Sequence, residues 1–314
     1  SFGKKFTEMI LKKYKPKKLI IFSRDELKQF LMEENLNKFK KTLRFFIGDV
    51  RDPERLDFAL RGVDFVVHAA ALKQVVVAEY NPSECVKTNI LGAENVIKSS
   101  IKNEVNKVIA LSTDKAVNPV NLYGATKLAS DKLFIAANNI VGSKNTRFSV
   151  VRYGNVIGSR GSIVPFFLDL KNRGEKTLPI TDNQMTRFWV SLEQGVNFSI
   201  KCFQIMIGGE ILIFKSPTIK IVDLAKAINP NAQLKTIGVR PGEKIHESLC
   251  SVDDARYTLE FKNHYLIKPS ITLNIKSTYK KNKLNELGKK VLDDFEYDSG
   301  TNKKFLKQGQ IKNI

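Results

Sequence analysis

Short apolar segments alternate with longer amphipathic stretches over the first half of the chain. The apolar segments predict strands at 18–22, 43–47, 63–67, 107–111 and 148–152. The stretches between them have helical periodicity at about 4–14, 24–39, 53–61, 83–102 and 123–140. This alternation predicts an α/β fold with a doubly wound parallel sheet. In such a sheet ligands bind beyond the carboxyl ends of the strands, so residues that follow each strand are the first candidates for function.

The composition argues against several classes of protein. The chain has 314 residues, 42% of them hydrophobic, and its 52 basic and 32 acidic residues give a net charge of +20. A basic surface can bind nucleic acid, but the lysines are spread along the whole chain without interleaved aromatic residues. We therefore expect no nucleic-acid partner. Attraction of phosphorylated small ligands is the other use of such a charge.

Membrane and metal chemistry are not expected either. No run approaches the roughly 20 apolar residues that cross a bilayer, and the first residues lack the apolar block of a secretory signal. Cys85, Cys202 and Cys250 have no metal-ligand spacing and are expected to be reduced thiols of a cytoplasmic protein. The chain has only three histidines, which disfavours zinc chemistry and a Ser-His-Asp triad.

The residues after the first two predicted strands suit a nicotinamide dinucleotide. The first strand leads to Ser23 and Arg24, and Lys28 follows one helical turn later. Folds that bind NAD usually place an acid here for the ribose 2′-hydroxyl, whereas an arginine accommodates the 2′-phosphate of NADP. A planar guanidinium binds phosphate well, so NADP is the predicted cofactor. Asp49 and Val50, after the second strand, are expected to bind and cover the adenine ring.

Two further segments belong to the same predicted cofactor site. Small residues let the backbone lie close to a flat cofactor, and the strand at 63–67 is followed by Ala69, Ala70 and Ala71. A dinucleotide fold also begins with a strand and a glycine-rich turn that holds the pyrophosphate at a helix N-terminus. The first residues, Ser1, Phe2 and Gly3, correspond to the tail of that turn. The first strand and most of the glycine loop are therefore expected to be missing from this sequence.

A pair of residues at helical spacing carries the predicted chemistry. Tyr123 and Lys127 are spaced i, i+4, so they share one helix face, and the strand before them ends in Ser112 and Thr113. A lysine ammonium beside a phenol favours the phenolate and is expected to lower a pKa that starts near 10. The phenolate can remove a hydroxyl proton while the carbon's hydride leaves to nicotinamide.

These motifs resemble the extended short-chain dehydrogenase/reductase superfamily. Within it, the chain is most similar to the inverting UDP-N-acetylglucosamine 4,6-dehydratases, which open the pseudaminic acid route of flagellin glycosylation. The resemblance covers roughly residues 1–300. The motifs that carry it are SFGK at 1–4, SRDELKQ at 23–29, FFIGDVRD at 45–52, HAAALK at 68–73, AEYNPSECVKTNI at 78–90, LSTDKAVNPVNLYGATKLASDKL at 111–133, SVVRYGNVIGSRGSIVPFF at 149–167, MTRFW at 185–189 and RPGEKIHE at 240–247.

The resemblance implies a role for each catalytic residue. Tyr123, assisted by Lys127, takes the C4 hydroxyl proton, and Thr113 positions that hydroxyl. A dehydratase must also remove the C5 proton and protonate the leaving C6 oxygen, and the resemblance assigns these tasks to Lys115 and Asp114. Hydride returns to C6, and reprotonation of C5 from the opposite face inverts that centre.

The resemblance also implies the binding residues. Lys73 and Asn89 join the cofactor site, and Lys73 also lies at the mouth of the substrate site. The residues expected to hold UDP-N-acetylglucosamine are Lys73, Asn155, Val156, Arg187, Arg240 and Glu243. The chain departs from many relatives at Gln74 and Val76, where they carry His and Pro. This departure is expected to reshape a loop near the sugar.

The implied organisation has three parts. Residues 1–160, with about 189–217, form the NADP-binding domain. Residues of about 161–188 and 218–280 form a smaller substrate-binding lobe, and 281–314 form a C-terminal extension. The family resemblance suggests a homo-oligomer, a hexamer. Two alternatives stay open, a UDP-sugar 4-epimerase of the same superfamily and a non-catalytic NADP-binding regulator.

Overall fold

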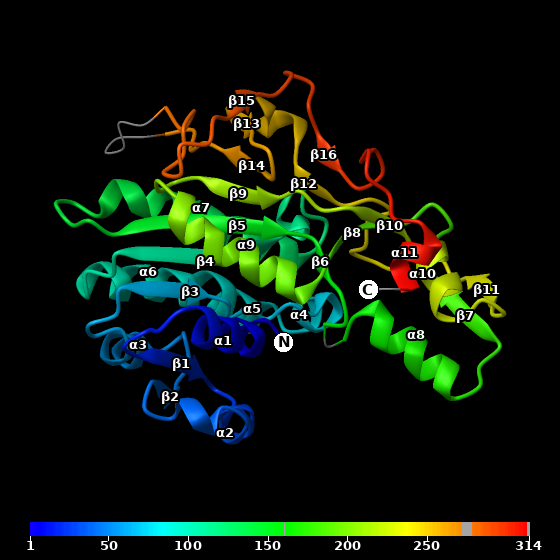
Figure 1. Ribbon diagram of the computed structural model, residues 1–314. Helices are drawn as coiled ribbons and strands as arrows, with labels where there is room; N and C mark the ends of the chain where they lie inside the picture. The colour runs from blue at the N-terminus through cyan, green and yellow to red at the C-terminus, as the bar shows by residue number, and fades with distance from the viewer. Residues whose placement is uncertain (160, 272–277, 313–314) are drawn as a thin grey trace.

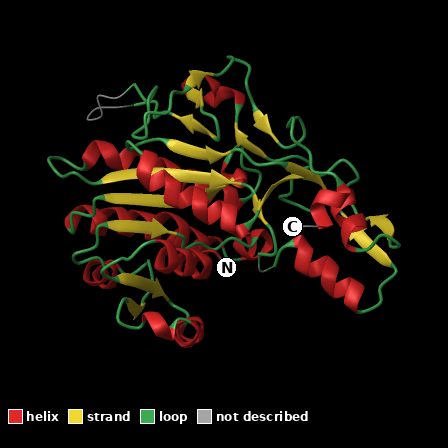
Figure 2. Ribbon diagram, in the orientation of Figure 1, coloured by secondary structure: helices red, strands yellow, loops and turns green. Residues whose placement is uncertain are grey.

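The computed structural model describes residues 1–159, 161–271 and 278–312, and its centre is a seven-stranded sheet (Figures 1 and 2). Four parallel strands form one part of it, and three antiparallel strands extend its far edge. In spatial order they are β3 (Phe65–His68), β4 (Lys107–Thr113), β5 (Arg147–Tyr153), β9 (Ile211–Phe214), β14 (His264–Ile267), β13 (Thr258–Glu260) and β15 (Lys289–Lys290). The two central parallel strands, β4 and β5, end together at Thr113 and Tyr153, which are paired in the register.

The first two strands stand apart from this sheet. β1 (Leu19–Ser23) and β2 (Leu43–Ile47) pair with each other in parallel, with Leu19 opposite Leu43. Among the described residues they form no ladder with β3, so the expected parallel sheet is present as two blocks. All five strands predicted from the apolar pattern are present within about two residues, and the α/β fold class is confirmed.

Helices cover both faces of the sheet. On one face α6 (Gly92–Lys102) and α7 (Leu122–Ile140) contact β3, β4 and β5; on the other α9 (Leu192–Ile205) contacts β4, β5 and β9 and carries α1 (Phe2–Lys13) on its outside. Short polar side chains start several of them: Asn121 accepts a hydrogen bond from the Gly124 amide at 2.7 Å at the start of α7. The other helices of this half are α2 (Glu26–Asn35), α3 (Pro53–Ala59), α4 (Val75–Tyr80) and α5 (Pro82–Val86), with short 3-10 turns at Asn37–Phe39 and Asp114–Ala116.

The helix expected at 83–102 is interrupted. α5 runs into a π-helical segment at Lys87–Leu91 before α6 begins. Such π segments often mark functional sites. Here the segment turns Asn89 inward, where it is buried.

A smaller region follows β5 and has its own hydrophobic core, in which Phe167, Leu178 and Trp189 are buried. Its ladders join β6 (Asn155–Val156), β8 (Thr186–Val190) and β10 (Thr218–Lys220), and pair β7 (Thr177–Ile180) with β11 (Gln233–Thr236). Its helices are α8 (Ile163–Asn172), α10 (Ile221–Ile228) and α11 (Gln308–Lys312).

The last part of the chain packs against both regions. β12 (Ser248–Cys250) pairs with β16 (Tyr297–Asp298), Tyr297 belongs to the core of the large sheet, and Ile311 belongs to the core of the smaller region. A 3-10 turn at Val252–Tyr257 leads into β13. The segment after residue 281 is thus integrated into the fold where the structure describes it.

Candidate active site

The predicted catalytic residues converge where β4 ends and α7 begins. Tyr123 and Lys127 lie on one face of α7 and are 9% and 3% exposed. Thr113, the last residue of β4, forms a hydrogen bond with the Tyr123 side chain. Its own hydroxyl also donates to Asp114 Oδ1 at 2.9 Å. The sequence spacing therefore translates into contact among these groups.

A second group of charges completes this cluster. Lys115 Nζ lies 3.1 Å from Asp114 Oδ1 and 3.1 Å from Glu247 Oε1. Asp114 and Glu247 are both buried, and Arg187 Nε approaches the same Glu247 oxygen at 4.0 Å. Asp114 Oδ2 has no hydrogen-bond partner among the described residues. Glu247 was not singled out from the sequence, although it is the last residue of the RPGEKIHE motif.

The burial of this cluster controls its protonation. Burial raises the pKa of Tyr123 to about 12, and the Lys115 ammonium opposes this rise. The prediction that Lys127 lowers the Tyr123 pKa is therefore wrong, because burial dominates and the opposing charge comes from Lys115. Burial alone would lower the pKa of Lys115, but the Asp114 and Glu247 carboxylates outweigh it and raise that pKa well above its ordinary value. Lys115 is thus an ammonium in the resting protein.

A buried ion pair lies under the catalytic helix. Asp131, one turn beyond Lys127 on α7, accepts hydrogen bonds from Ser112 Oγ at 2.8 Å and Arg152 Nε at 3.1 Å. Burial lowers the pKa of Lys127, and the Asp131 carboxylate opposes this decrease. The i+4 spacing from Lys127 could have identified Asp131 from the sequence.

The residues predicted for the adenosine end of a cofactor lie at the tips of β1 and β2. Arg24 reaches Asp49 Oδ2 at 3.4 Å, while Arg51 Nε binds the same oxygen at 2.9 Å. Burial would raise the pKa of Asp49, but the hydrogen bonds from Arg51 and the charge of Arg24 lower it. Val50 is buried beside this group, and Lys28 pairs with Asp25. The carboxylate is thus fixed and ionised, and the Arg24 side chain is half exposed beside it.

The start of α1 reaches the carboxyl edge of the sheet. The Phe2 ring stacks on Tyr153, and the ring centroids are 6.4 Å apart. Tyr153 is close enough to Tyr123 for the charge of one phenolate to raise the pKa of the other phenol. The first turn of α1 contains no acidic residue, so its N-terminal dipole is available to an anion. The contact of Ser1, Phe2 and Gly3 with a pyrophosphate stays a prediction, with which the position of this helix end is compatible.

The loop after β3 carries Ala69, Ala70 and Ala71, and it is fixed by Asn89. The Asn89 amide donates to Leu72 O at 2.9 Å and accepts from Leu72 N at 2.8 Å. Asn89 also donates to Thr126 on α7 at 3.0 Å. It therefore ties this loop to the catalytic helix, and its direct contact with a cofactor stays a prediction.

The substrate-side predictions fall into two places. Asn155, with Val156 on β6, has a buried Oδ1 that lacks a hydrogen-bond partner among the described residues. Arg187 is buried, and its guanidinium donates to Ile245 O at 2.9 Å and Lys244 O at 2.8 Å. These two side chains lie on paired strands next to the catalytic cluster.

The other substrate-side residues lie farther out. Arg240 pairs with Glu243 and is largely exposed, and Thr181 donates to Glu243 at 3.5 Å. Lys73 is also exposed, in the loop before α4. Gln74, where relatives carry His, lies against Gly161: a Cβ there would be 2.7 Å from Gln74 Nε2. Gln74 therefore connects the loop before α4 with the loop that contains Gly161, next to the site.

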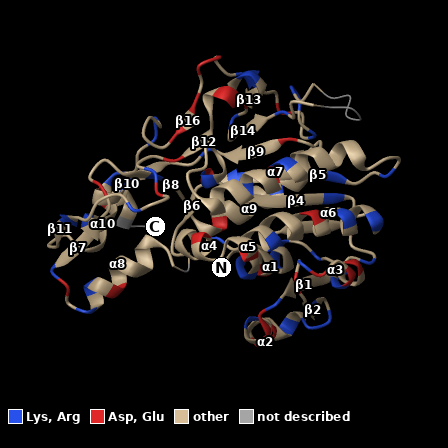
Figure 3. Ribbon diagram, turned by 180° about the vertical axis from the view of Figure 1, so that it is seen from behind, with Lys and Arg blue, Asp and Glu red and all other residues tan. Residues whose placement is uncertain are grey.

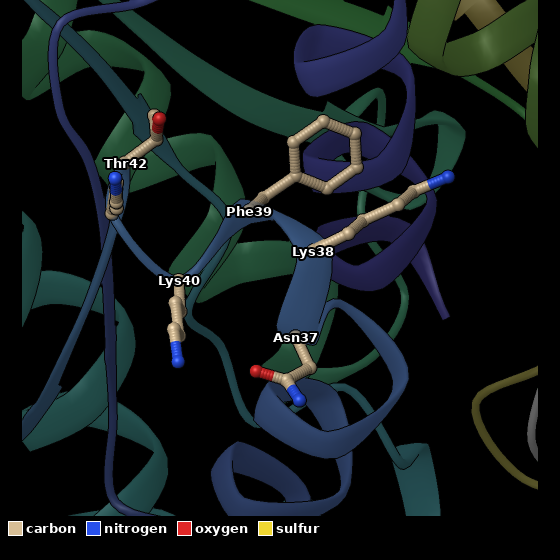
Figure 4. A pocket seen from close by; sticks show the side chains of 6 residues that line it. Asn37, Lys38, Phe39, Lys40 and Thr42 are labelled. Atoms are coloured by element: carbon tan, nitrogen blue, oxygen red, sulfur yellow. The ribbon is translucent and has the colours of Figure 1, made fainter.

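Outside the candidate site, the relevant features are a pocket, the distribution of charge, and the absence of metal sites and membrane-spanning helices among the described residues. A pocket lined by residues 37–42 lies before β2, at the amino end of that strand and opposite to the candidate site (Figure 4). Lys and Arg are spread over helices and loops of both regions (Figure 3). Within residues 1–159, 161–271 and 278–312, no group of side chains could hold a metal ion, and no helix is long and apolar enough to cross a bilayer.

Comparison with known proteins decides the family. Residues 1–269 match the family described as polysaccharide biosynthesis protein. The chain belongs to this family. A Campylobacter jejuni protein named UDP-N-acetylglucosamine 4,6-dehydratase (inverting) is 59% identical over 315 residues, which cover 100% of this chain and 94% of that protein. The resemblance inferred from the motifs is thereby confirmed.

Two more family relatives broaden the comparison. A Rickettsia canadensis protein named UDP-glucose 4-epimerase is 46% identical over 255 residues, or 80% of this chain and 74% of that protein. The X-ray structure of Pen from Bacillus thuringiensis superposes with a TM-score of 0.87 at 34% identity and covers 99% of this chain and 93% of that one. The fold is therefore shared over nearly the whole chain, while the relatives carry names for two different reactions.

Proposed function

We propose that this protein catalyses the NADP-dependent 4,6-dehydration of UDP-N-acetylglucosamine with inversion at C5. The observation that carries the proposal is the Asp114–Lys115 ion pair beside Tyr123, in which Asp114 is buried and the Lys115 side chain is 22% exposed. An epimerase needs a single proton-transfer group near C4, whereas water elimination needs two more for C5 and the C6 oxygen. The 59% identity to a protein named for this reaction supports the same conclusion.

The first step is oxidation at C4. Thr113 hydrogen-bonds Tyr123 and is placed to orient the C4 hydroxyl, whose proton passes to the Tyr123 oxygen. The Tyr123 oxygen accepts this proton as a phenolate. Burial raises the pKa of Tyr123 to about 12, so the phenolate is the minor form in the resting protein, and the Lys115 ammonium is the charge that stabilises it. When bound, the nicotinamide supplies the hydride acceptor at C4 and later the hydride donor at C6.

Water elimination follows from the charges around Lys115. Lys115 passes a proton to Asp114 across 3.1 Å, which leaves an amine and a carboxylic acid. The amine removes the C5 proton, which the C4 ketone has acidified, while Asp114 protonates the C6 hydroxyl and water leaves. Lys115 is again an ammonium and Asp114 again a carboxylate. C5 finally gains a proton on the opposite face, which inverts it. The proton that Tyr123 took from the C4 hydroxyl, delivered directly or through solvent, balances this gain and returns Tyr123 to the phenolate.

NADP is the proposed cofactor because Arg24 lies half exposed at the tip of β1. The ionised Asp49 beside it is suited to the adenine amino group, and Val50 to its ring face. The start of α1 would hold the pyrophosphate. Ala69–Ala71, Lys73, Asn89, Tyr123 and Lys127 would line the remainder of the cofactor site.

The UDP part of the substrate is proposed to bind between Asn155 and the loop after β11. Asn155 Oδ1 is a buried acceptor that is free to bind a ligand donor. Arg240 offers a charge-assisted contact to the diphosphate, with Glu243 beside it. Arg187 and Val156 are proposed to line the same UDP site. The Arg187 guanidinium also donates to the carbonyl oxygens of Lys244 and Ile245, which follow Arg240 and Glu243 in the chain.

The wider setting of the enzyme rests on the resemblance alone. We propose a cytoplasmic homo-oligomer, a hexamer, whose product supplies pseudaminic acid for flagellin glycosylation. The division into a NADP-binding domain at 1–160 with 189–217 and a substrate lobe at 161–188 with 218–280 is part of the same proposal. The two separate hydrophobic cores support that division.

A proton NMR time course tests the reaction. UDP-N-acetylglucosamine is incubated with the protein and NADP in heavy water. A 4-keto-6-deoxy product with deuterium at an inverted C5 is expected. Formation of the galacto epimer without water loss would favour a 4-epimerase, as the Rickettsia relative is named. No conversion at all would favour a NADP-binding regulator.

A further inference from the structure

We propose that Glu247 is a positioning residue that holds the Lys115 ammonium in line with Asp114 and keeps the buried cluster neutral during proton transfer. This inference rests on the proposed dehydratase function and adds a residue to its machinery. Its basis is the placement of Lys115 Nζ at 3.1 Å from both carboxylates. Ion pairs with two carboxylates, Asp114 and Glu247, fix the position of the Lys115 ammonium. A single ion pair would leave the flexible lysine side chain free to rotate.

The charges of the ion-paired groups balance only when Glu247 is included. These groups are two cations, Lys115 and Arg187, and two carboxylates, Asp114 and Glu247. Lys244 also interacts with this cluster through its charge, and the Asp298 carboxylate beside it offsets that charge. When the Lys115 proton moves to Asp114, both become neutral and Glu247 still offsets Arg187. Without Glu247 the resting cluster would hold one uncompensated buried positive charge, which is costly in a dry site. That charge would also lower the pKa of Lys115.

The fold fixes the Glu247 backbone from two sides. Glu247 N donates to Ser299 Oγ at 2.8 Å, and Ser299 N donates to Glu247 O at 2.9 Å. Ser299 Oγ in turn meets Thr186 Oγ1 on β8 at 2.8 Å. The segment after residue 281, far from the catalytic motif in sequence, therefore sets the position of this carboxylate.

The loop that leads to Glu247 is attached to the catalytic helix. Asn121, the N-cap of α7, donates to Gly242 O at 2.8 Å, and Lys244 Nζ donates to Val117 O at 2.6 Å. Gly242 has a φ of +77°, and a Cβ there would lie 3.1 Å from Asn121 Cβ. These contacts couple the loop to the segment around Asp114 and Lys115, and they help to keep the distance between Glu247 and Lys115 constant.

The test compares Glu247→Gln with the matched control Glu260→Gln. Glu260 also binds a lysine, Lys215, at 2.7 Å, but it lies on β13, outside the catalytic cluster, and its side chain is 50% exposed. We expect Glu247→Gln to reduce kcat for water loss by about 10- to 100-fold, in the range for a small misplacement of a catalytic group. The KM for UDP-N-acetylglucosamine should change less than about threefold, because binding is separate from this step. Glu260→Gln should match the wild type.

The pH profile separates this role from a structural one. Glu247 is one of the two carboxylates that raise the pKa of Lys115. Loss of its charge lowers that pKa, so kcat of Glu247→Gln should fall at an alkaline pH at which kcat of the wild type is still constant. Glu247→Asp keeps the charge but shortens the reach, so its kcat should fall without a shift of the alkaline limb of the profile. A Glu247→Gln profile reduced equally at all pH values would overturn the proposal. If this variant does not fold, the Glu247→Asp profile still decides, because a shifted limb there would contradict the charge argument.

A double variant closes the test. If Glu247 acts through Lys115, Glu247→Gln should cost little further activity when added to Lys115→Ala. A full multiplicative loss would show an independent role and refute the inference. Absence of water loss by the wild-type protein would instead refute the proposed function, so the two failures are distinguishable.

Discussion

Substitution of Gly124 by Ala should disturb the catalytic motif directly. Gly124 lies next to Tyr123 near the start of α7, where the helix passes very close to the Asp114–Ala116 turn. A Cβ at this position would lie 2.1 Å from the carbonyl oxygen of Lys115 and 3.1 Å from Pro119 Cβ. Close carbon–oxygen contacts in proteins are about 3.3 Å or longer. The turn and the helix must therefore separate by roughly 1 Å.

The magnitude follows from two opposing effects. Overpacking of this kind costs about 1–3 kcal/mol, and the contact with a backbone oxygen places Gly124→Ala at the upper end. Alanine regains up to about 1 kcal/mol of helix propensity. The net loss of about 2 kcal/mol corresponds to a Tm lower by about 4–8 °C. A shift of about 1 Å at Lys115 should also reduce kcat by about 100-fold.

Thermal unfolding and steady-state kinetics measure both effects. Gly195→Ala is the matched control, because Gly195 also lies near the start of a helix. Its Cβ would meet Val190 at 3.7 Å and Tyr153 at 3.9 Å, which are ordinary contacts. The control should keep the wild-type Tm or gain slightly. An unchanged Tm and kcat in Gly124→Ala would refute the argument from close approach.

Three further outcomes are expected. Arg24→Ala should raise the KM for NADP at least tenfold and leave that for NAD nearly unchanged, measured with both cofactors; an unchanged preference would remove Arg24 from the 2′-phosphate site. Asp131→Asn should lower the free energy of unfolding by about 3–5 kcal/mol in urea titrations, because Arg152 is left buried without its carboxylate. Burial lowers the pKa of His68 to about 3 and of His264 to about 4. The unfolded chain therefore binds more protons below about pH 6.5, and stability should fall from pH 7 to pH 5 by up to about 1.4 kcal/mol per unit for each histidine; equal urea midpoints at the two pH values would contradict this.

Much of the fold was predictable because its signals are local. The five apolar segments all became strands, since each can be identified from a few neighbouring residues. The helix expected at 83–102 was only partly right, because a π segment at Lys87–Leu91 interrupts it. The π segment contains Asn89, which forms hydrogen bonds with Leu72 in the loop after β3 and with Thr126 on α7. No local pattern in the sequence encodes those partners.

The protonation of the site was the least predictable property. The i, i+4 spacing correctly placed Tyr123 and Lys127 on one face, but the direction of the Tyr123 pKa was wrong. The sequence contains the charges near a phenol but not the depth at which the fold buries it. Burial outweighs the nearby ammonium here, so a prediction from spacing alone has the wrong sign.

The charged cluster at the site includes residues that lie far in sequence from the Asp114–Lys115 motif, and Glu247 is one of them. Asp114 and Lys115 are adjacent in sequence, and their pairing could be expected, whereas Glu247 and Arg187 come from a distant loop and from β8. The loop reaches the cluster because two other segments bind it: Val117 and Asn121 just before α7, and Ser299 just after β16. An Asp-Lys pair with no such partner would be a buried cation and anion beside an unbalanced arginine. The dipeptide therefore specifies the chemistry only within a fold that also delivers the second carboxylate, and that delivery depends on contacts spread across the entire chain.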